Sequence, residues 1–231
     1  MTRMVHDVSR LLFPVVCEVC GRELVDGERV MCLHCNYAMP RTGCHRSDFS
    51  FMHQRLMGKV PVERGAAWFY YQRGSGYADM IHTAKYRGMH RVVRELGEMY
   101  ARELVPDGFF DGIDVIEPVP MRGVKKMVRG YNQSEMLANG ISAVTGIETG
   151  DHLVMTRRHS TQTRRGAYAR FLNVQGAFGV RHADEIEGCH VLVVDDVITT
   201  GATLLACCGA IHRAVPSARI SVLTLAAARE L

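Results

Sequence analysis

The apolar positions along the chain follow two periods, one typical of strands and one typical of helices. The run AAWFYY at 66–71 predicts a strand, and 89–105 carries its large apolar side chains on one helical face. Asn132 followed by Glu135 is a capping-box-like helix start, for which Gly146 is a plausible stop. The predicted strands are 66–71, 113–119, 190–194 and 220–226, and the predicted helices are 76–86, 89–105, the segment from Asn132 to Gly146, and 203–215. Strands alternating with helices predict an α/β fold with a mostly parallel sheet and right-handed crossovers.

The same pattern divides the chain into three parts. Residues 62–231 carry the α/β pattern and are predicted to form one domain. Residues 47–61 have weak periodicity and are predicted to be a connector. Residues 1–46 are predicted to hold an N-terminal helix and a small cysteine-rich finger.

Four of the eight cysteines form two close pairs near the N-terminus. Two residues separate Cys17 from Cys20 and Cys32 from Cys35, and eleven residues lie between the pairs. Such knuckles can point four thiolates at one ion, so the spacing predicts a structural zinc site that supplies much of the finger's folding energy. A redox pair and unmetallated thiols are the alternatives. Three further potential ligands, for which surface positions are the simpler interpretation, are His34, Cys44 and His45.

The strand predicted at 190–194 leads directly into two carboxylates, Asp195 and Asp196. Its unbroken apolar run is typical of a central strand that is covered on both faces. Ligands of parallel sheets bind at the carboxyl ends of the strands, and the turn TTGAT at 199–203 can cradle a phosphate with its backbone amides. Consecutive strand residues point to opposite faces, so the two acids are expected to have different tasks. The pattern favours a sugar phosphate over a nucleoside triphosphate, since the Walker lysine is missing.

Composition and charge limit the protein class. With 231 residues, of which 47% are apolar, the chain can bury a proper core. A net charge of +4 is compatible with phosphate-bearing partners. No apolar run approaches the roughly 18 residues of a membrane span, so we expect no membrane insertion. The short apolar block near the start, with Asp7 in it, is unlike a secretory signal, so we expect a cytoplasmic protein without a disulfide framework.

These motifs together resemble a known family. The stretch VLVVDDVITTGAT at 191–203 resembles the 5-phosphoribosyl-1-diphosphate (PRPP) motif of type I phosphoribosyltransferases. Over about residues 14–228 the chain resembles the ComF family, amidophosphoribosyltransferase-like proteins associated with natural competence and DNA uptake. The further residues that carry the likeness are the cysteine finger, KYRG at 85–88, Pro118 to Pro120, RGYNQ at 129–133, Gln162 and Thr163, Arg170 with Asn173, and Gly176 to Phe178.

The resemblance implies a fold and a set of site residues. The implied fold is a type I phosphoribosyltransferase-like parallel sheet flanked by helices, with a small N-terminal four-cysteine zinc finger. Asp195 and Asp196 are the implied catalytic residues, holding the ribose hydroxyls directly or through Mg²⁺-bound water. The implied PRPP-binding residues are Val197, Ile198, Thr199, Thr200, Gly201, Ala202, Thr203, Arg122 and Lys85, with Lys125, Lys126 and Arg129 available for the pyrophosphate. Residues 157–173 have the position of the mobile hood that excludes water in this fold.

The basic residues of that hood segment also fit another role. The possible hood or DNA contacts are Arg129, Arg157, Arg158, Arg164, Arg165 and Arg170, with Tyr168 and Phe171 among them. Cations interleaved with aromatic rings are typical of a groove for single-stranded DNA. Three hypotheses therefore stay open: a phosphoribosyltransferase with an unidentified acceptor, a DNA-binding competence protein with a non-catalytic PRPP pocket, and an adaptor for a partner such as a competence helicase.

Overall fold

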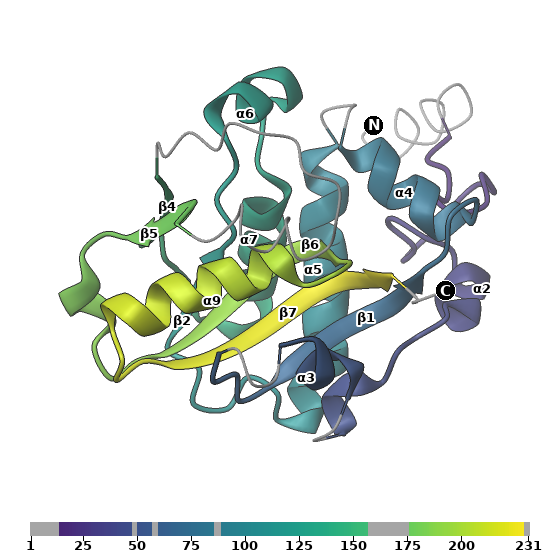
Figure 1. The fold of residues 1–231 in the computed structure, drawn as a ribbon. Helices are drawn as coiled ribbons and strands as arrows, with labels where there is room; N and C mark the ends of the chain where they lie inside the picture. Colours follow the sequence, from purple (N-terminus) through teal and green to yellow (C-terminus); the bar gives the residue numbers. More distant parts are fainter. Residues whose placement is uncertain (1–13, 48–49, 57–59, 86–88, 157–175, 229–231) are drawn as a thin grey trace, which may run out of the picture.

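A computed structural model describes residues 14–47, 50–56, 60–85, 89–156 and 176–228. The centre of the fold is a five-stranded sheet in the order β1-β7-β6-β2-β3, and all of its pairings are parallel. The strands are β1 (Gly65–Tyr71), β2 (Val115–Pro118), β3 (Glu148–Thr149), β6 (His190–Ile198) and β7 (Arg219–Ala228). The predicted parallel α/β sheet is confirmed, with β6 at its centre (Figure 1).

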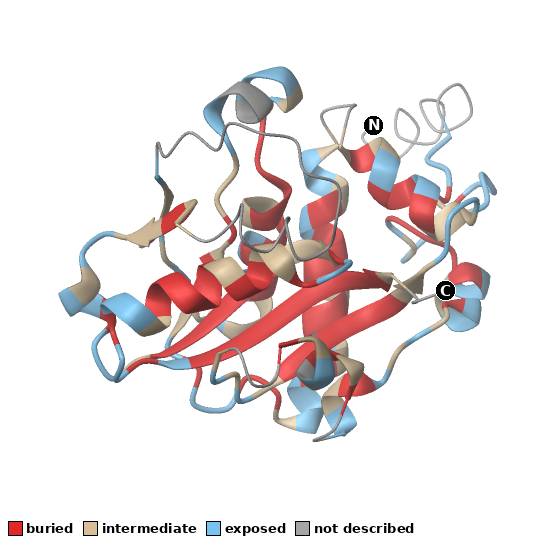
Figure 2. Cartoon of the chain, viewed as in Figure 1, coloured by how far each residue is buried: buried red, intermediate tan, exposed pale blue. Residues whose placement is uncertain are grey.

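Helices cover both faces of this sheet. Helices α5 (His90–Leu104) and α7 (Gln133–Thr145) lie on one face, and α9 (Ala202–Ala214) lies on the other (Figure 1). The side chains of β6 alternate between them: Leu192 and Val194 join the core under α5 and α7, and Val191 and Val193 join the core under α9. This double burial explains the unbroken apolar run, and Figure 2 shows the central strands buried over most of their length.

Strand β6 is longer than the sequence predicted. We expected it to end at Val194, but it continues to Ile198 through both carboxylates, because β7 pairs with it as far as Ile198. The turn then runs to Gly201, which caps α9 with a left-handed backbone (φ 77°). The acids therefore lie on the last residues of a strand and not in the turn behind it.

Several short elements had no periodic signal in the sequence. The segment 47–61, expected to be a connector, contains a helix whose Met52 and Leu56 are fully buried in the core under α9. The predicted helix at 76–86 is α4, which ends at Ala84. The elements not predicted are α2 (Leu33–Ala38), α3 (Phe51–Leu56), α6 (Gly123–Arg129), the edge strand β3, the antiparallel pair β4 (Leu153–Met155) and β5 (Phe178–Val180), and the 3-10 turns Cys44–Arg46, Val105–Asp107 and Ala183–Ile186. Within the described residues, no helix is both long and apolar enough to cross a membrane.

The cysteine finger packs against the start of the α/β domain. The loop after it forms a bridge from Arg41 to Phe69, so it covers the free edge of β1. The first knuckle contacts the start of α4 (Gly76–Ala84) so closely that a Cβ on Gly76 would lie 2.1 Å from the carbonyl oxygen of Val19. The hydroxyl of Tyr77, on the same helix, donates to the carbonyl of Cys35 at 2.7 Å. The finger is therefore fixed to α4.

Helices α5 and α7 approach each other at glycines. A Cβ on Gly140 of α7 would lie 2.1 Å from the carbonyl oxygen of Arg94, and one on Gly97 of α5 would lie 2.6 Å from that of Leu137. Both obstacles are backbone atoms, which cannot rotate away. This contact fixes α7, whose first turn reaches the site described below.

We expect Gly140→Ala to lower the free energy of unfolding by about 1–3 kcal/mol, the usual cost of overpacking a core. Urea unfolding measures this change. Gly123→Ala is the matched control, because a Cβ there meets nothing within 4 Å, and its effect should stay within about 0.5 kcal/mol. Equal stability of the two variants would contradict the close helix contact.

Candidate functional site

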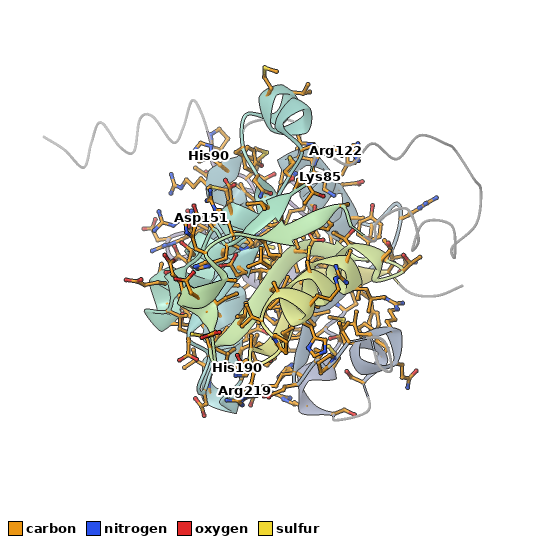
Figure 3. The ribbon with its side chains drawn as sticks, turned by 60° about the vertical axis from the view of Figure 1, so that its left-hand side comes forward. Lys85, His90, Arg122, Asp151, His190 and Arg219 are labelled. Carbon is orange, nitrogen blue, oxygen red and sulfur yellow. The ribbon has the colours of Figure 1, made fainter. Side chains whose placement is uncertain are left out.

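The predicted site residues lie at the carboxyl ends of the parallel strands. Figure 3 shows Lys85 and Arg122 at one end of the molecule, and His190 and Arg219, the first residues of β6 and β7, at the other. The site is therefore at the edge where parallel sheets bind ligands.

The two carboxylates have different partners. The hydroxyl of Ser134, in the first turn of α7, donates to Asp195 Oδ1 at 3.1 Å. The backbone N–H of Asp196 donates to the same oxygen at 2.9 Å. The side chain of Asp196 instead forms an ion pair with Lys85 at the end of α4, with 2.7 Å between Nζ and Oδ2. The two side chains thus have separate partners, as expected because neighbouring residues of a strand point their side chains to opposite faces.

The environment of Asp195 disfavours its charge. Burial and the nearby charge of Asp196 raise the pKa of Asp195 to about 7. The hydrogen bonds from the Asp196 N–H and Ser134, together with the charge of Lys85, act in the opposite direction. Asp195 therefore changes its charge near neutral pH.

A cavity of about 290 Å³ opens beside the two acids. Its lining includes both acids, three cations and Thr203 at the start of α9, so cationic and anionic side chains face one space. The lining residues are Lys85, Val119, Pro120, Met121, Arg122, Arg129, Asn132, Gln133, Ser134, Met155, Asp195, Asp196 and Thr203. A smaller cavity of about 40 Å³ adjoins it, formed by Asp195 and residues 197–204. The structure thus brings Lys85, Arg122 and Arg129 to the acid pair and keeps the turn 199–203 next to it.

The segment 129–134 ties the parts of this site together. The hydroxyl of Tyr131 donates to the carbonyl of Ala84, next to Lys85. The buried amide of Asn132 donates to the carbonyl of Val119 at 3.0 Å, and its Oδ1 accepts from the N–H of Ser134 at 3.2 Å. The sequence marked RGYNQ as a family motif and Asn132 as a helix cap, but it gave no signal that Ser134 contacts Asp195.

Some predicted residues lie outside this description. Arg157, Arg158, Arg164, Arg165 and Arg170 fall in the segment 157–175, outside the described residues. The flanking strands β4 and β5 are described, and Met155 of β4 lines the cavity. Lys125 and Lys126 lie on α6, and their side chains are also outside the description.

The four cysteines of the finger form one cluster. The sulfurs of Cys17, Cys20, Cys32 and Cys35 lie within 4.8 Å of one another. Gly21 forms the turn of the first knuckle with a left-handed backbone (φ 73°), a conformation that favours glycine. The cluster suits a metal ion such as zinc, because four convergent thiolates are a zinc donor set.

A backbone donor in the finger favours the thiolate of Cys32, whereas burial and the neighbouring sulfurs raise the pKa of Cys35. The N–H of Cys35 donates to Cys32 Sγ at 3.4 Å and lowers the pKa of Cys32 to about 6. The other potential ligands are placed elsewhere: the sulfur of Cys44 accepts from the N–H of Ala67, and His45 pairs with Asp107. His34 is exposed and lies outside the cluster.

Comparison with known proteins identifies the class. The family model described as "Phosphoribosyl transferase domain" matches residues 100–231, more than half of the chain. The chain belongs to this phosphoribosyltransferase family. Within it, the chain is a ComF-family protein, as its relatives show.

Three relatives carry that assignment. The chain is 26% identical over 204 residues to the DNA utilization protein YhgH of Escherichia coli K12, covering 84% of this chain and 89% of that one. It is 37% identical over 94 residues to competence protein F of Haemophilus influenzae, covering 39% and 41%. It is 24% identical over 135 residues to competence protein ComFC of Bacillus subtilis, covering 55% and 52%.

The chain is also similar to two solved structures. The structure of an allosteric regulatory enzyme of purine biosynthesis is 23% identical to this chain, with a TM-score of 0.39 over 58% of this chain. The glutamine PRPP amidotransferase of B. subtilis gives the same identity, TM-score and share of this chain. The chain covers only about a quarter of either of these larger proteins, 25% and 26%.

We expect the purified protein to carry about one zinc ion per chain, since the four sulfurs converge on one point. Removing the ion with a chelator should lower the melting temperature, because the ion holds together a finger whose buried Leu24, Val30 and Met31 belong to the core of the α/β domain. Elemental analysis and thermal unfolding measure these two effects. Cys35→Ser should lose the metal, and Cys189→Ser, outside the cluster, should keep it. A metal-free protein of unchanged melting temperature would contradict the site.

We expect the carboxyl of Asp195 to make stability depend on pH. Its pKa in the folded protein, about 7, lies above the ~3.9 of an unfolded aspartate, so between these values the folded state binds more protons. This group therefore stabilises the fold at low pH, and its contribution is lost as the pH rises towards about 7.

Asp195→Asn removes that dependence. The free energy of unfolding of the variant minus that of the wild type should increase between about pH 5 and pH 7.5 in urea titrations. Asp184→Asn, at an exposed position, is the control and should give a constant difference. A constant difference for Asp195→Asn as well would contradict the raised pKa.

Proposed function

We propose that the 290 Å³ cavity binds PRPP with Mg²⁺ and that the protein takes part in DNA uptake as a ComF-type phosphoribosyltransferase-like protein. One observation carries this proposal: the two carboxylates at the strand end lie between two kinds of phosphate-binding group. The turn 199–203 and the start of α9 line the smaller cavity, and the cations Lys85, Arg122 and Arg129 line the larger one. PRPP has matching chemistry, with hydroxyls on its ribose between two anionic groups. The names of the relatives, competence proteins and DNA utilization proteins, support the role in DNA uptake.

Each group of residues has a separate task in this proposal. The carboxylates of Asp195 and Asp196 accept hydrogen bonds from the ribose hydroxyls. The N–H groups of the turn 199–203 and the start of α9 bind the 5-phosphate, where the helix dipole favours negative charge. Gly201 allows the backbone to approach that phosphate, since its left-handed φ of 77° suits glycine.

The cations face the diphosphate. Lys85, Arg122 and Arg129 line the cavity and would balance the charge that grows on the departing pyrophosphate. Before the ligand binds, Lys85 neutralises Asp196, so the strand end does not hold two unpaired negative charges. Ligand phosphates give Lys85 a second anionic partner within the same cavity.

The donor set also fits Mg²⁺. Carboxylate oxygens are the protein ligands that Mg²⁺ prefers, and Asp195 and Asp196 offer them beside the cavity. A bound Mg²⁺ ion would neutralise ligand phosphates and share the ribose hydroxyls with these two residues. Transfer would move ribose 5-phosphate to an acceptor by positioning and charge stabilisation, without a protein nucleophile.

We expect PRPP with Mg²⁺ to bind the zinc-loaded protein and to release heat in a calorimetric titration. The double variant Asp195→Asn, Asp196→Asn should bind at least about 100-fold more weakly, because it replaces two charged acceptors. Absence of binding to the folded wild-type protein would overturn the proposal.

The control is a second pair of acids. Asp184→Asn with Glu187→Gln changes the net charge equally, at exposed positions before the start of β6. This control should bind PRPP like the wild type. A comparable loss in the control would attribute the effect to overall charge and contradict a specific role for the acid pair.

A further inference from the structure

One buried amide in the cavity has an unused donor. Gln133 is only 3% exposed, and its Oε1 accepts a hydrogen bond from Arg129 Nη1 at 3.1 Å. Its Nε2 is buried and has no hydrogen-bond partner among the described residues. A buried donor without a partner is costly in proteins, and this one belongs to a residue that lines the cavity, where a ligand acceptor would remove that cost.

The surroundings of this amide favour an anion. Gln133 is the first residue of α7, whose positive dipole end faces the cavity that Gln133 lines. Arg122 and Arg129 line the same cavity. Asn132, the preceding residue, already donates to Val119 and accepts from Ser134.

The hydrogen bond from Arg129 also fixes which end of the amide faces the ligand. A guanidinium can only donate, so Oε1 must be the atom that accepts from it. The NH₂ group is then held as a donor, and phosphate oxygens are acceptors that it can satisfy.

We propose that Gln133 Nε2 donates to the diphosphate of the ligand, and that it thereby selects ligands with a diphosphate over ribose 5-phosphate. This inference rests on the proposed function. The diphosphate is favoured over the 5-phosphate because residues 199–202 of the turn line the smaller cavity, which Gln133 does not line. Gln133 instead lies beside the cations of the larger cavity.

Two substitutions of similar size test this role. Gln133→Met keeps the length of the side chain and removes the donor, and Gln133→Glu replaces the donor with an anion. Gln72→Glu is the matched control, since it makes the same exchange at an exposed residue that does not line the cavity. Melting temperatures establish that each variant is folded, and either Gln133 variant alone is sufficient for the test.

Calorimetric titrations with PRPP, inorganic pyrophosphate and ribose 5-phosphate, each with Mg²⁺, provide the readout. We expect both Gln133 variants to bind PRPP and pyrophosphate at least about 10-fold more weakly, as for a lost hydrogen bond to a charged group. Their affinity for ribose 5-phosphate should stay within about 2-fold of the wild type, and Gln72→Glu should bind all three ligands normally.

Two results would overturn the inference. An equal loss for all three ligands would show that Gln133 only positions α7. Unchanged PRPP binding in both variants would show that the amide does not contact the diphosphate. These outcomes differ from failure of the proposed function, in which the wild-type protein itself does not bind PRPP.

Discussion

Two adjacent carboxylates at the end of a buried central strand must each find a partner, because an uncompensated charge there opposes folding. The chain meets this constraint with groups from distant segments. Ser134 comes from the start of α7, and Lys85 comes from the end of α4. The contacts that compensate the two charges therefore also assemble the site. Burial outweighs them at Asp195 and raises its pKa to about 7, so this carboxyl changes its charge near neutral pH.

The partners of these acids are positioned by the packing behind them. Helix α7 is fixed where its Gly140 meets the backbone of α5. Helix α4 is held at its start by the cysteine finger, through Gly76 and Tyr77, and at its end by Tyr131. The finger thus supports the element that presents Lys85, which connects the cysteine cluster physically to the cavity beside the acid pair.

The sequence predicted the sheet, the long helices and the acid pair, because their signals are local and periodic. It misplaced the end of β6, since charged residues at Asp195 and Asp196 look like a turn until the pairing with β7 is known. The helix Phe51–Leu56 and the strands β3, β4 and β5 are too short for a period to appear.

The contacts within the site could not be predicted from the sequence, for a different reason. Ser134 and Asp195 are 61 residues apart, and Tyr131 and Ala84 are 47 apart, so only the fold brings them together. The unused donor of Gln133 likewise depends on Arg129 occupying the other end of the amide.

A crystal structure of the protein with PRPP and Mg²⁺ tests the account most directly. The account predicts the ribose hydroxyls on Asp195 and Asp196, the 5-phosphate against the turn 199–203, and the diphosphate beside Lys85 and the start of α7. A ligand bound away from this edge of the sheet would contradict it, as would a reversed ligand with its 5-phosphate at α7.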